Sequence, residues 1–233
     1  FHWWIEFYGI IKRGGFDVCI GNPPYVAYSK VKGDYQVKNF ATEKCNNLYS
    51  LIMERSLNLI SVDQFIGMIV PSSSASSKNF KLLAEMLLEN QVWVSSYSNR
   101  PGKLFHGVEQ RLSIWILENI SRIKIFVSHY QHWYQQERSQ LFSGIDYAPS
   151  DLWEHSGMPI KSGCPIGVSI FKKIVAKKSY LGLFSKPGNG SVWYHDGPTY
   201  WVRALSFEPN IGKKSKSSNH YHRILVESQS NAL

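Results

Sequence analysis

The apolar residues in the first half of the chain follow two different periods. Four short segments are mainly apolar and are bounded by Gly, Pro or polar residues, which is typical of buried strands. These segments are Phe16–Gly21, Phe65–Val70, Val92–Tyr97 and Leu112–Leu117. Two further segments place their apolar residues at helical spacing, and they are Asn47–Ile60 and Asn79–Glu89. This order predicts an α/β sheet in which the last two strands form an antiparallel hairpin at one edge.

The segments between these elements are polar. Tyr25–Cys45 shows no clear period and is predicted to be a mobile loop. The serine-rich segment Ser72–Ser77 follows a strand and precedes a helix, so its side chains are predicted to cap that helix. An anion site at its backbone amides is the alternative.

The second half of the chain has a different character. Trp, Tyr, His and Lys are frequent, and the turn-forming sequences SGCP, KPGNG and HDGP recur along it. We expect a short helix at Ser169–Lys178 and two strands at Ser191–Tyr194 and Thr199–Ala204. A boundary is therefore expected near residues 125–145, with the α/β sheet before it and a mixed, basic segment after it.

The composition is that of a chain that can fold. Of its 233 residues, 43% are hydrophobic and 14% are aromatic, and no apolar run approaches the ~18 residues that a membrane-spanning helix needs. We expect no membrane partner and a cytoplasmic location. The three cysteines are odd in number and far apart, which favours reduced thiols. The opening FHWWIEFYGII, without an initiator Met, is expected to lie inside a larger protein.

The net charge of +9 is concentrated in the second half. Residues 1–120 contain 12 Lys or Arg and 10 Asp or Glu, a net of +2, whereas residues 121–233 contain 14 and 7, a net of +7. Such an excess favours an anionic partner, and nucleic acid is the common one. A solvated basic surface is the alternative.

The motif Asn22-Pro23-Pro24-Tyr25 follows directly on the first predicted strand. Prolines cannot continue a central sheet, so the motif is either a rigid turn or a binding loop at the carboxyl end of the strand. The Asn22 amide oxygen and the Pro23 carbonyl can accept both N–H bonds of an exocyclic amine, which turns the nitrogen lone pair toward an incoming methyl group. Tyr25 offers a flat face for a base that is flipped out of a duplex.

The sequence FDVCIGNPPY resembles motif IV of the amino-type methyltransferases, in the branch that acts on adenine N6 in DNA. The wider chain resembles large single-chain restriction–modification methyltransferases of the type IIG kind. The resemblance includes FHWWIEFYGII, GMIVPSS and LFHGVEQRLSIWIL, and continues more weakly through YWVRALSFEP. It implies a partial Rossmann-like methyltransferase sheet, with the C-terminal half of the catalytic domain in residues 1–125. A linker and the start of a DNA target-recognition region would then occupy residues 126–233.

The resemblance also implies roles for single residues. Phe105 precedes a strand and would stack on the target base opposite Tyr25, although a core Phe that closes the hairpin is an equal alternative. Arg111 would contact a phosphate or pair with Glu109. Pro24 would stiffen the loop in which Asn22 and Pro23 orient the amine.

The resemblance implies S-adenosylmethionine as the cofactor. The family binds it with a Gly-rich loop after the first strand, and that segment is expected upstream of Phe1. Within the chain, Gly14-Gly15 precedes a strand and Gly188-Asn189-Gly190 lies in a basic turn, so neither is predicted to be the cofactor loop.

The basic half supplies further candidate DNA contacts, which are Lys172, Lys173, Lys177, Lys178, Lys213, Lys214 and Lys216. The first four are alternatively the solvated face of a helix whose apolar side is Ile170, Phe171, Ile174 and Val175. The histidine pairs His129/His132 and His220/His222 lack the Cys or carboxylate partners of a metal site, so no metal is predicted.

These observations predict a function. We expect the chain to be part of a restriction–modification enzyme that methylates adenine N6 in DNA, and to be a truncated fragment that is inactive alone. Because NPPY also occurs in other methyltransferases, protein glutamine or RNA is the alternative substrate. A nucleic-acid-binding remnant without catalysis is the alternative outside enzymes. The DNA recognition sequence, a fused endonuclease and the oligomeric state cannot be read from the sequence.

Overall fold

The computed structural model describes residues 2–34, 36–120, 124–151, 159, 162–176, 185–195, 204–205 and 221–226. The chain divides into two compact units, residues 1–173 and 174–233, which are described separately. The elements of the first unit, with 3₁₀ turns written η, are α1 (Trp3–Glu6), α2 (Tyr8–Lys12), β1 (Phe16–Gly21), η1 (Tyr28–Lys30), η2 (Ala41–Cys45), α3 (Leu48–Leu57), β2 (Ile60–Pro71), η3 (Ser72–Ala75), η4 (Lys78–Phe80), α4 (Lys81–Leu88), β3 (Gln91–Tyr97), β4 (Leu112–Glu118), β5 (Ile125–Gln131), η5 (Gln135–Gln140) and β6 (Tyr147–Pro149). Helix α6 (Pro165–Ala176) runs across the boundary between the units.

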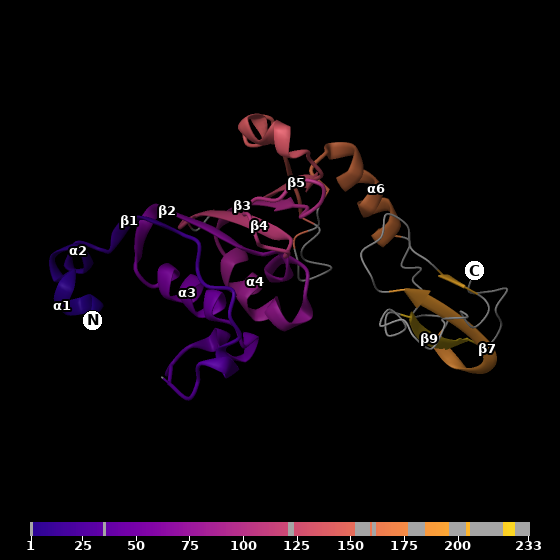
Figure 1. Ribbon diagram of the computed structural model, residues 1–233, viewed down its shortest axis with the longest axis horizontal. Coiled ribbons are helices and arrows are strands. Elements are labelled where there is room, and N and C mark those ends of the chain that lie inside the picture. The colour runs from indigo at the N-terminus through magenta and orange to yellow at the C-terminus, as the bar shows by residue number, and fades with distance from the viewer. Residues whose placement is uncertain are drawn as a thin grey trace. The chain divides into compact units, whose positions relative to one another are not determined.

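Strands β1 to β6 form one mixed sheet in the order β1-β2-β4-β3-β5-β6 (Figure 1). β1 runs parallel to β2, and β5 runs parallel to β3. β4 is antiparallel to both β2 and β3, and β6 is antiparallel to β5. The α/β class, the four predicted strands and the two predicted helices are confirmed.

The β3–β4 hairpin is antiparallel, as predicted, but its place in the sheet differs from the prediction. It lies inside the sheet and not at an edge, because β5 and β6 continue the sheet beyond β3. The sheet therefore extends past residue 125. The pairing of β5 with β3 joins segments that are separated along the chain by β4, so no local apolar pattern could indicate it.

Helices α3 and α4 cover one face of this sheet. The inward side chains of four strands pack against them, and Trp115, Val92 and Val70 are fully buried. The predicted apolar stripe of α4 is confirmed, since Phe80, Leu83, Leu87 and Leu88 all lie in this core. Burial of this many large apolar side chains stabilises the unit and fixes the ends of the strands relative to one another.

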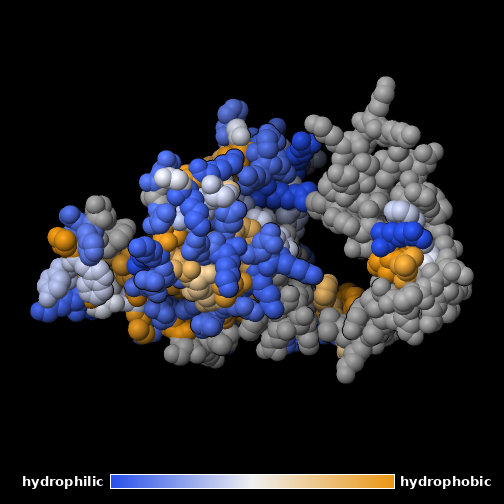
Figure 2. Space-filling view, turned by 90° about the horizontal axis from the view of Figure 1, so that it is seen from below, coloured by the Kyte–Doolittle hydropathy of each residue, from blue (hydrophilic) through white to orange (hydrophobic). Residues whose placement is uncertain are grey.

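The opposite face of the sheet carries apolar side chains that the described residues leave open. A row of paired residues crosses it from Ile20 through Gly67 and Ile116 to Trp93, whose ring stacks on Phe126 with the centroids 5.5 Å apart. Ile20 is 84% exposed, and among the described strands β1 is paired on one side only. In Figure 2, further apolar groups gather at the end of the unit that carries α1 and α2. Such a face and open edge are typical of surfaces that another segment covers.

The second unit contains β7 (Ser185–His195), β8 (Ala204–Leu205) and β9 (Tyr221–Val226), which form an antiparallel sheet in the order β8-β7-β9. Strand β7 includes the predicted strand Ser191–Tyr194 but begins earlier, and Gly188-Asn189-Gly190 falls in a stretch of irregular pairing, where Ser185 and Gly190 both pair with Val226 of β9. The predicted strand Thr199–Ala204 is described only at Ala204, which begins β8. The predicted helix Ser169–Lys178 is confirmed as α6, which starts four residues earlier.

Candidate functional site

Three loops meet at one edge of the first sheet. Asn22 follows the carboxyl end of β1, and the serine turn η3 follows the carboxyl end of the parallel strand β2. Loop 98–111 connects the carboxyl end of β3 to the start of β4, and Leu112 at that start pairs with both Pro71 and Tyr97. The carboxyl ends of parallel strands are where open α/β sheets bind ligands.

The Asn22–Tyr25 loop has a defined internal geometry. The Tyr25 hydroxyl lies 2.5 Å from Asn22 Oδ1 and 3.2 Å from the carbonyl oxygen of Ile69 in β2. Asn22 and Pro24 are exposed, whereas Pro23 is buried. None of the residues that the structure describes donates a hydrogen bond to the Pro23 carbonyl. The loop thus offers two oxygen acceptors beside an aromatic ring.

The Tyr25 hydroxyl is suited to hold the Asn22 amide in one orientation. Burial raises the pKa of the Tyr25 phenol to about 12, so at neutral pH the hydroxyl carries its proton and donates. A donor at this position favours the amide rotamer in which the oxygen, and not the NH₂ group, faces the phenol. A carbonyl oxygen has a second lone pair, which remains for an incoming N–H.

Phe105 and Tyr25 lie in the same part of the molecule. Both pack against a second apolar cluster, formed by Tyr97, Leu104, Leu112, Trp133 and Leu141. Phe105 is partly buried there, 80 positions along the chain from Tyr25. The two aromatic residues that the sequence had proposed as a pair thus border the same apolar cluster.

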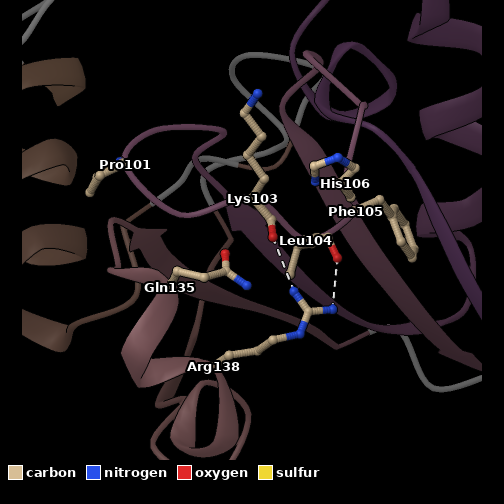
Figure 3. A pocket seen from close by; sticks show the side chains of 7 residues that line it. All are labelled: Pro101, Lys103, Leu104, Phe105, His106, Gln135 and Arg138. Carbon is tan, nitrogen blue, oxygen red and sulfur yellow. Dashed lines mark hydrogen bonds between the residues drawn. The ribbon is translucent and has the colours of Figure 1, made fainter.

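Loop 98–111 is held by Arg138 of η5. The Arg138 guanidinium donates to the carbonyl oxygens of Lys103 and Leu104 at 3.0 and 2.8 Å (Figure 3). The backbone of Gly102 packs against Trp133, where a Cβ atom would lie 2.8 Å from the indole ring. Between the loop and η5 lies an open cleft of about 540 Å³. Its lining residues are Pro101, Lys103, Leu104, Phe105, His106, Gln135 and Arg138.

The segment Tyr25–Cys45, which was predicted to be a mobile loop, contains two 3₁₀ turns and is anchored at a few buried positions, although most of its residues between 29 and 41 are exposed. Glu54 of α3 is only 5% exposed, and its carboxylate accepts hydrogen bonds from the backbone N–H groups of Ala41 and Thr42 and from the Thr42 hydroxyl. Tyr28 is buried in the same segment, which forms the turns η1 and η2. Irregular backbone is here ordered by one buried carboxylate, so apolar periodicity could not reveal it.

The serine turn η3 does not cap helix α4, contrary to the prediction. The N-cap position of α4 is Phe80, which makes no side-chain cap hydrogen bond. The serines instead bond to the sheet, since the Ser72 hydroxyl accepts from Ser113 at 2.9 Å and the Ser74 hydroxyl accepts from the Trp115 indole at 3.0 Å. These buried hydroxyls tie the end of β2 to β4.

The predicted DNA contacts are placed as follows. Arg111 is partly buried at the start of β4, and its carbonyl oxygen accepts the Ser72 amide at 2.8 Å. Lys172 pairs with Asp151 at 2.6 Å, and Lys173 is exposed. Ile170, Phe171 and Ile174 are also exposed. Lys177, Lys178, Lys213, Lys214 and Lys216 lie outside the described residues.

Metal-binding clusters and membrane spans were sought in the described part of the chain. No group of three or more His, Cys, Asp or Glu side chains in those ranges could hold a metal ion. None of the helices described is long and apolar enough to cross a membrane. All three cysteines are free.

Sequence reasoning missed two residues that shape the site, Arg138 and Glu54. Arg138 acts through backbone carbonyls, which every residue has, so no sequence signal marks its partners. Glu54 did carry a signal, because an acidic residue between Met53 and Arg55 interrupts an otherwise apolar helix start. Charged residues are rarely buried unless they are paired or hydrogen-bonded, so such a position is worth attention.

The first part of the chain is similar to known restriction-modification proteins. Residues 1–105 match the family model described as Eco57I restriction-modification methylase. A curated protein of Methanocaldococcus jannaschii, named "Putative type II restriction enzyme and methyltransferase RM.MjaORFECS2P", is 34% identical over 87 residues, which are 37% of this chain and 7% of that protein.

Solved structures were compared as well. The DrdV–DNA complex has a TM-score of 0.45 at 14% identity over 63% of this chain and 18% of that chain. A nuclease-deletion mutant of the type ISP restriction-modification enzyme LlaGI, in complex with a DNA substrate mimic, has a TM-score of 0.47 at 17% identity over 63% of this chain and 15% of that chain. The type IIG restriction endonuclease BpuSI has a TM-score of 0.39 at 14% identity over 63% of this chain and 20% of that chain. This chain therefore spans only a small part of each of these proteins.

Proposed function

Because residues 1–105 are homologous to restriction-modification methylases, we propose that this chain carries the substrate side of a methyl-transfer site for adenine N6 in DNA. The observation that supports this most is the geometry of the Asn22–Tyr25 loop. Two oxygen acceptors lie next to a partly buried aromatic ring, at the edge of the sheet where ligands bind. The DNA substrate, the adenine and the position N6 are all part of the proposal.

The two acceptors fit an exocyclic amine. The lone pair of such a nitrogen is delocalised into the ring, so the amine is a poor nucleophile. Asn22 Oδ1 and the Pro23 carbonyl accept its two N–H bonds and favour a pyramidal nitrogen whose lone pair points out of the base plane. Pro23 and Pro24 hold this backbone in one conformation, so little entropy is lost when the amine binds.

The aromatic residues fit a base. In this proposal Tyr25 stacks on one face of an extruded adenine and Phe105 contacts the other, which is supported by the packing of both side chains against the same cluster. A base inside a duplex cannot reach this loop, so the adenine must be flipped out. The domain that would read the surrounding DNA sequence is proposed to begin within residues 126–233.

S-adenosylmethionine would supply the methyl group, but the described residues do not form a complete site for it. Glycines with positive φ are Gly14, Gly15 and Gly107. The first two precede β1, at the edge of the sheet opposite to Asn22, and Gly107 lies in the loop beside Phe105. No Gly-rich turn follows a parallel strand in the described ranges. We therefore propose that the cofactor loop lies in a segment outside these residues, which also covers the open edge of β1.

The first prediction concerns this cofactor. The chain of 233 residues alone is expected to show no S-adenosylmethionine binding in the micromolar range, because its described residues contain no loop that could receive the cofactor. Isothermal titration calorimetry measures this directly, and the same titration on a methyltransferase with a complete loop is the positive control. Micromolar affinity of the isolated chain would show that it contains a cofactor site of its own.

The second prediction separates the two parts of the Tyr25 side chain. Tyr25→Phe keeps the ring but removes the donor to Asn22, so the single-turnover methylation rate should fall about tenfold with little change in DNA affinity. Tyr25→Ala also removes the stacking surface, which is worth about 1–3 kcal/mol per base. This variant should therefore lower the methylation rate substantially more than Tyr25→Phe does. The rates are measured by methyl incorporation into DNA in the complete enzyme. Equal rates in wild type and both variants would exclude Tyr25 from the site.

The alternatives of a protein glutamine or RNA substrate share the acceptor chemistry. The basic character of the second half, with a net of +7, favours nucleic acid over protein. Methyl incorporation by the complete enzyme into duplex DNA, RNA and protein, compared under the same conditions, decides between them.

A further inference from the structure

The cleft between loop 98–111 and η5 is built from side chains that differ from those around Asn22. Its polar lining consists of Lys103, His106, Gln135 and Arg138, and its apolar lining consists of Pro101, Leu104 and Phe105. None of these seven residues is acidic. The lining therefore combines cationic and neutral hydrogen-bond donors with an apolar wall (Figure 3).

Arg138 makes this cleft a preformed feature of the fold. It binds two consecutive carbonyls of the loop, and its helical turn is closed by a capping box between Tyr134 and Glu137. A guanidinium has five N–H donors, and these two bonds do not use all of them. The loop backbone, the guanidinium and the cleft wall are thus held together before any ligand binds, which lowers the entropic cost of binding.

The cleft is next to the proposed base site through one shared residue. Phe105 lines the cleft and also packs against the cluster that Tyr25 contacts. A DNA strand whose base enters between Tyr25 and Phe105 has to continue on both sides of that base. Its sugar-phosphate backbone then passes close to Phe105, where the cationic lining lies.

We propose that this cleft binds the phosphodiester backbone of the DNA strand beside the extruded base, with Lys103 and Arg138 as the main contacts. The proposal deepens the function proposed above and depends on it for the identity of the strand. The donors suit phosphate oxygens, and Leu104 and Pro101 suit the apolar side of a deoxyribose.

Glu109 weakens the proposed contact between Lys103 and a DNA phosphate. It forms an ion pair with Lys103, and that pairing holds the pKa of the exposed Glu109 carboxyl below its usual value. In the free protein the Glu109 carboxylate is therefore paired with the Lys103 ammonium. A phosphate has to replace Glu109 at Lys103, so Glu109 acts as an internal competitor.

This arrangement predicts effects of opposite sign for two neighbouring variants. Lys103→Gln should weaken duplex binding roughly three- to tenfold at low salt and reduce the steepness of the log–log salt dependence by about 0.9, the value for one phosphate contact. Glu109→Gln should strengthen binding at low salt, because it releases Lys103. Fluorescence anisotropy with a labelled duplex, titrated with the full chain from low to moderate salt, gives both quantities.

The chain offers a matched control pair. Lys81 and Glu85 form an ion pair at 3.5 Å on the surface of α4, and neither residue lines the cleft. Lys81→Gln and Glu85→Gln make the same changes in net charge as the two cleft variants. If each cleft variant matches its control in affinity and salt dependence, the effect is one of net charge only and the cleft proposal is wrong.

A failure of the cleft proposal can be distinguished from a failure of the proposed methyl-transfer reaction. These measurements detect DNA binding without methyl transfer, and both cleft variants leave Asn22 to Tyr25 unchanged. If the cleft variants bind DNA as their controls do, while methylation still requires Asn22, only the cleft proposal is wrong. An enzyme that does not depend on Asn22 would overturn the reaction, whatever the cleft variants show.

Discussion

Replacing Asn22 by alanine is expected to lower the rate of methyl transfer in the complete enzyme by about 10²–10³-fold, the usual cost of removing one positioned hydrogen-bonding group from a transition state. The amide oxygen matters most when the amine becomes pyramidal, so its loss affects the reaction more than binding. DNA affinity should stay within about twofold, since no phosphate contact is removed. Single-turnover methyl incorporation and anisotropy titrations measure the two quantities separately.

A second asparagine serves as the control for this variant. Asn58 is exposed at the C-terminal end of α3, and Asn58→Ala should leave the rate unchanged. The Tyr25 hydroxyl keeps a hydrogen-bond acceptor in the Asn22 variant, because the carbonyl oxygen of Ile69 lies 3.2 Å away. A structural collapse of the loop is therefore not expected. Near-normal single-turnover methylation by Asn22→Ala would rule out the role given to this residue.

Replacing Glu54 by alanine is expected to lower the free energy of unfolding by about 3 kcal/mol. The carboxylate is buried and accepts three hydrogen bonds, so its removal leaves the Ala41 and Thr42 donors without partners inside the protein. Each unsatisfied buried donor costs about 1–3 kcal/mol, offset in part by relaxation of the loop and entry of water. Urea unfolding of the full chain, followed by circular dichroism, measures the change.

Two comparison variants make the Glu54 result specific. Glu54→Gln keeps one acceptor oxygen and should fall between wild type and Glu54→Ala. Glu85→Ala removes an exposed carboxylate that pairs only with Lys81, and should change stability by less than about 1 kcal/mol. If Glu54→Ala were as stable as Glu85→Ala, the buried carboxylate would not be what orders the segment before α3.

Local sequence patterns were sufficient to predict the elements whose type depends on neighbouring residues. The apolar run of β1 and the helical stripe of α4 each depend on residues a few positions apart, so their types and approximate bounds could be predicted. The Asn22–Tyr25 loop was predictable for the same reason, because two prolines after a buried strand fix both the end of the strand and the backbone beyond it. The chemistry of an amide, a carbonyl and a phenol then follows from residue type.

Which distant segments share a surface could be seen only in the folded chain. The place of the β3–β4 hairpin inside the sheet depends on β5, and the neighbourhood of Tyr25 and Phe105 depends on a cluster that includes Trp133. The clamp of Arg138 on loop 98–111 and the burial of Glu54 use backbone carbonyls and amides as partners. Every residue supplies those groups, so the sequence cannot mark which of them will be used. Which backbone groups become partners depends on the folded chain, because only folding holds segments far apart in sequence within hydrogen-bond distance.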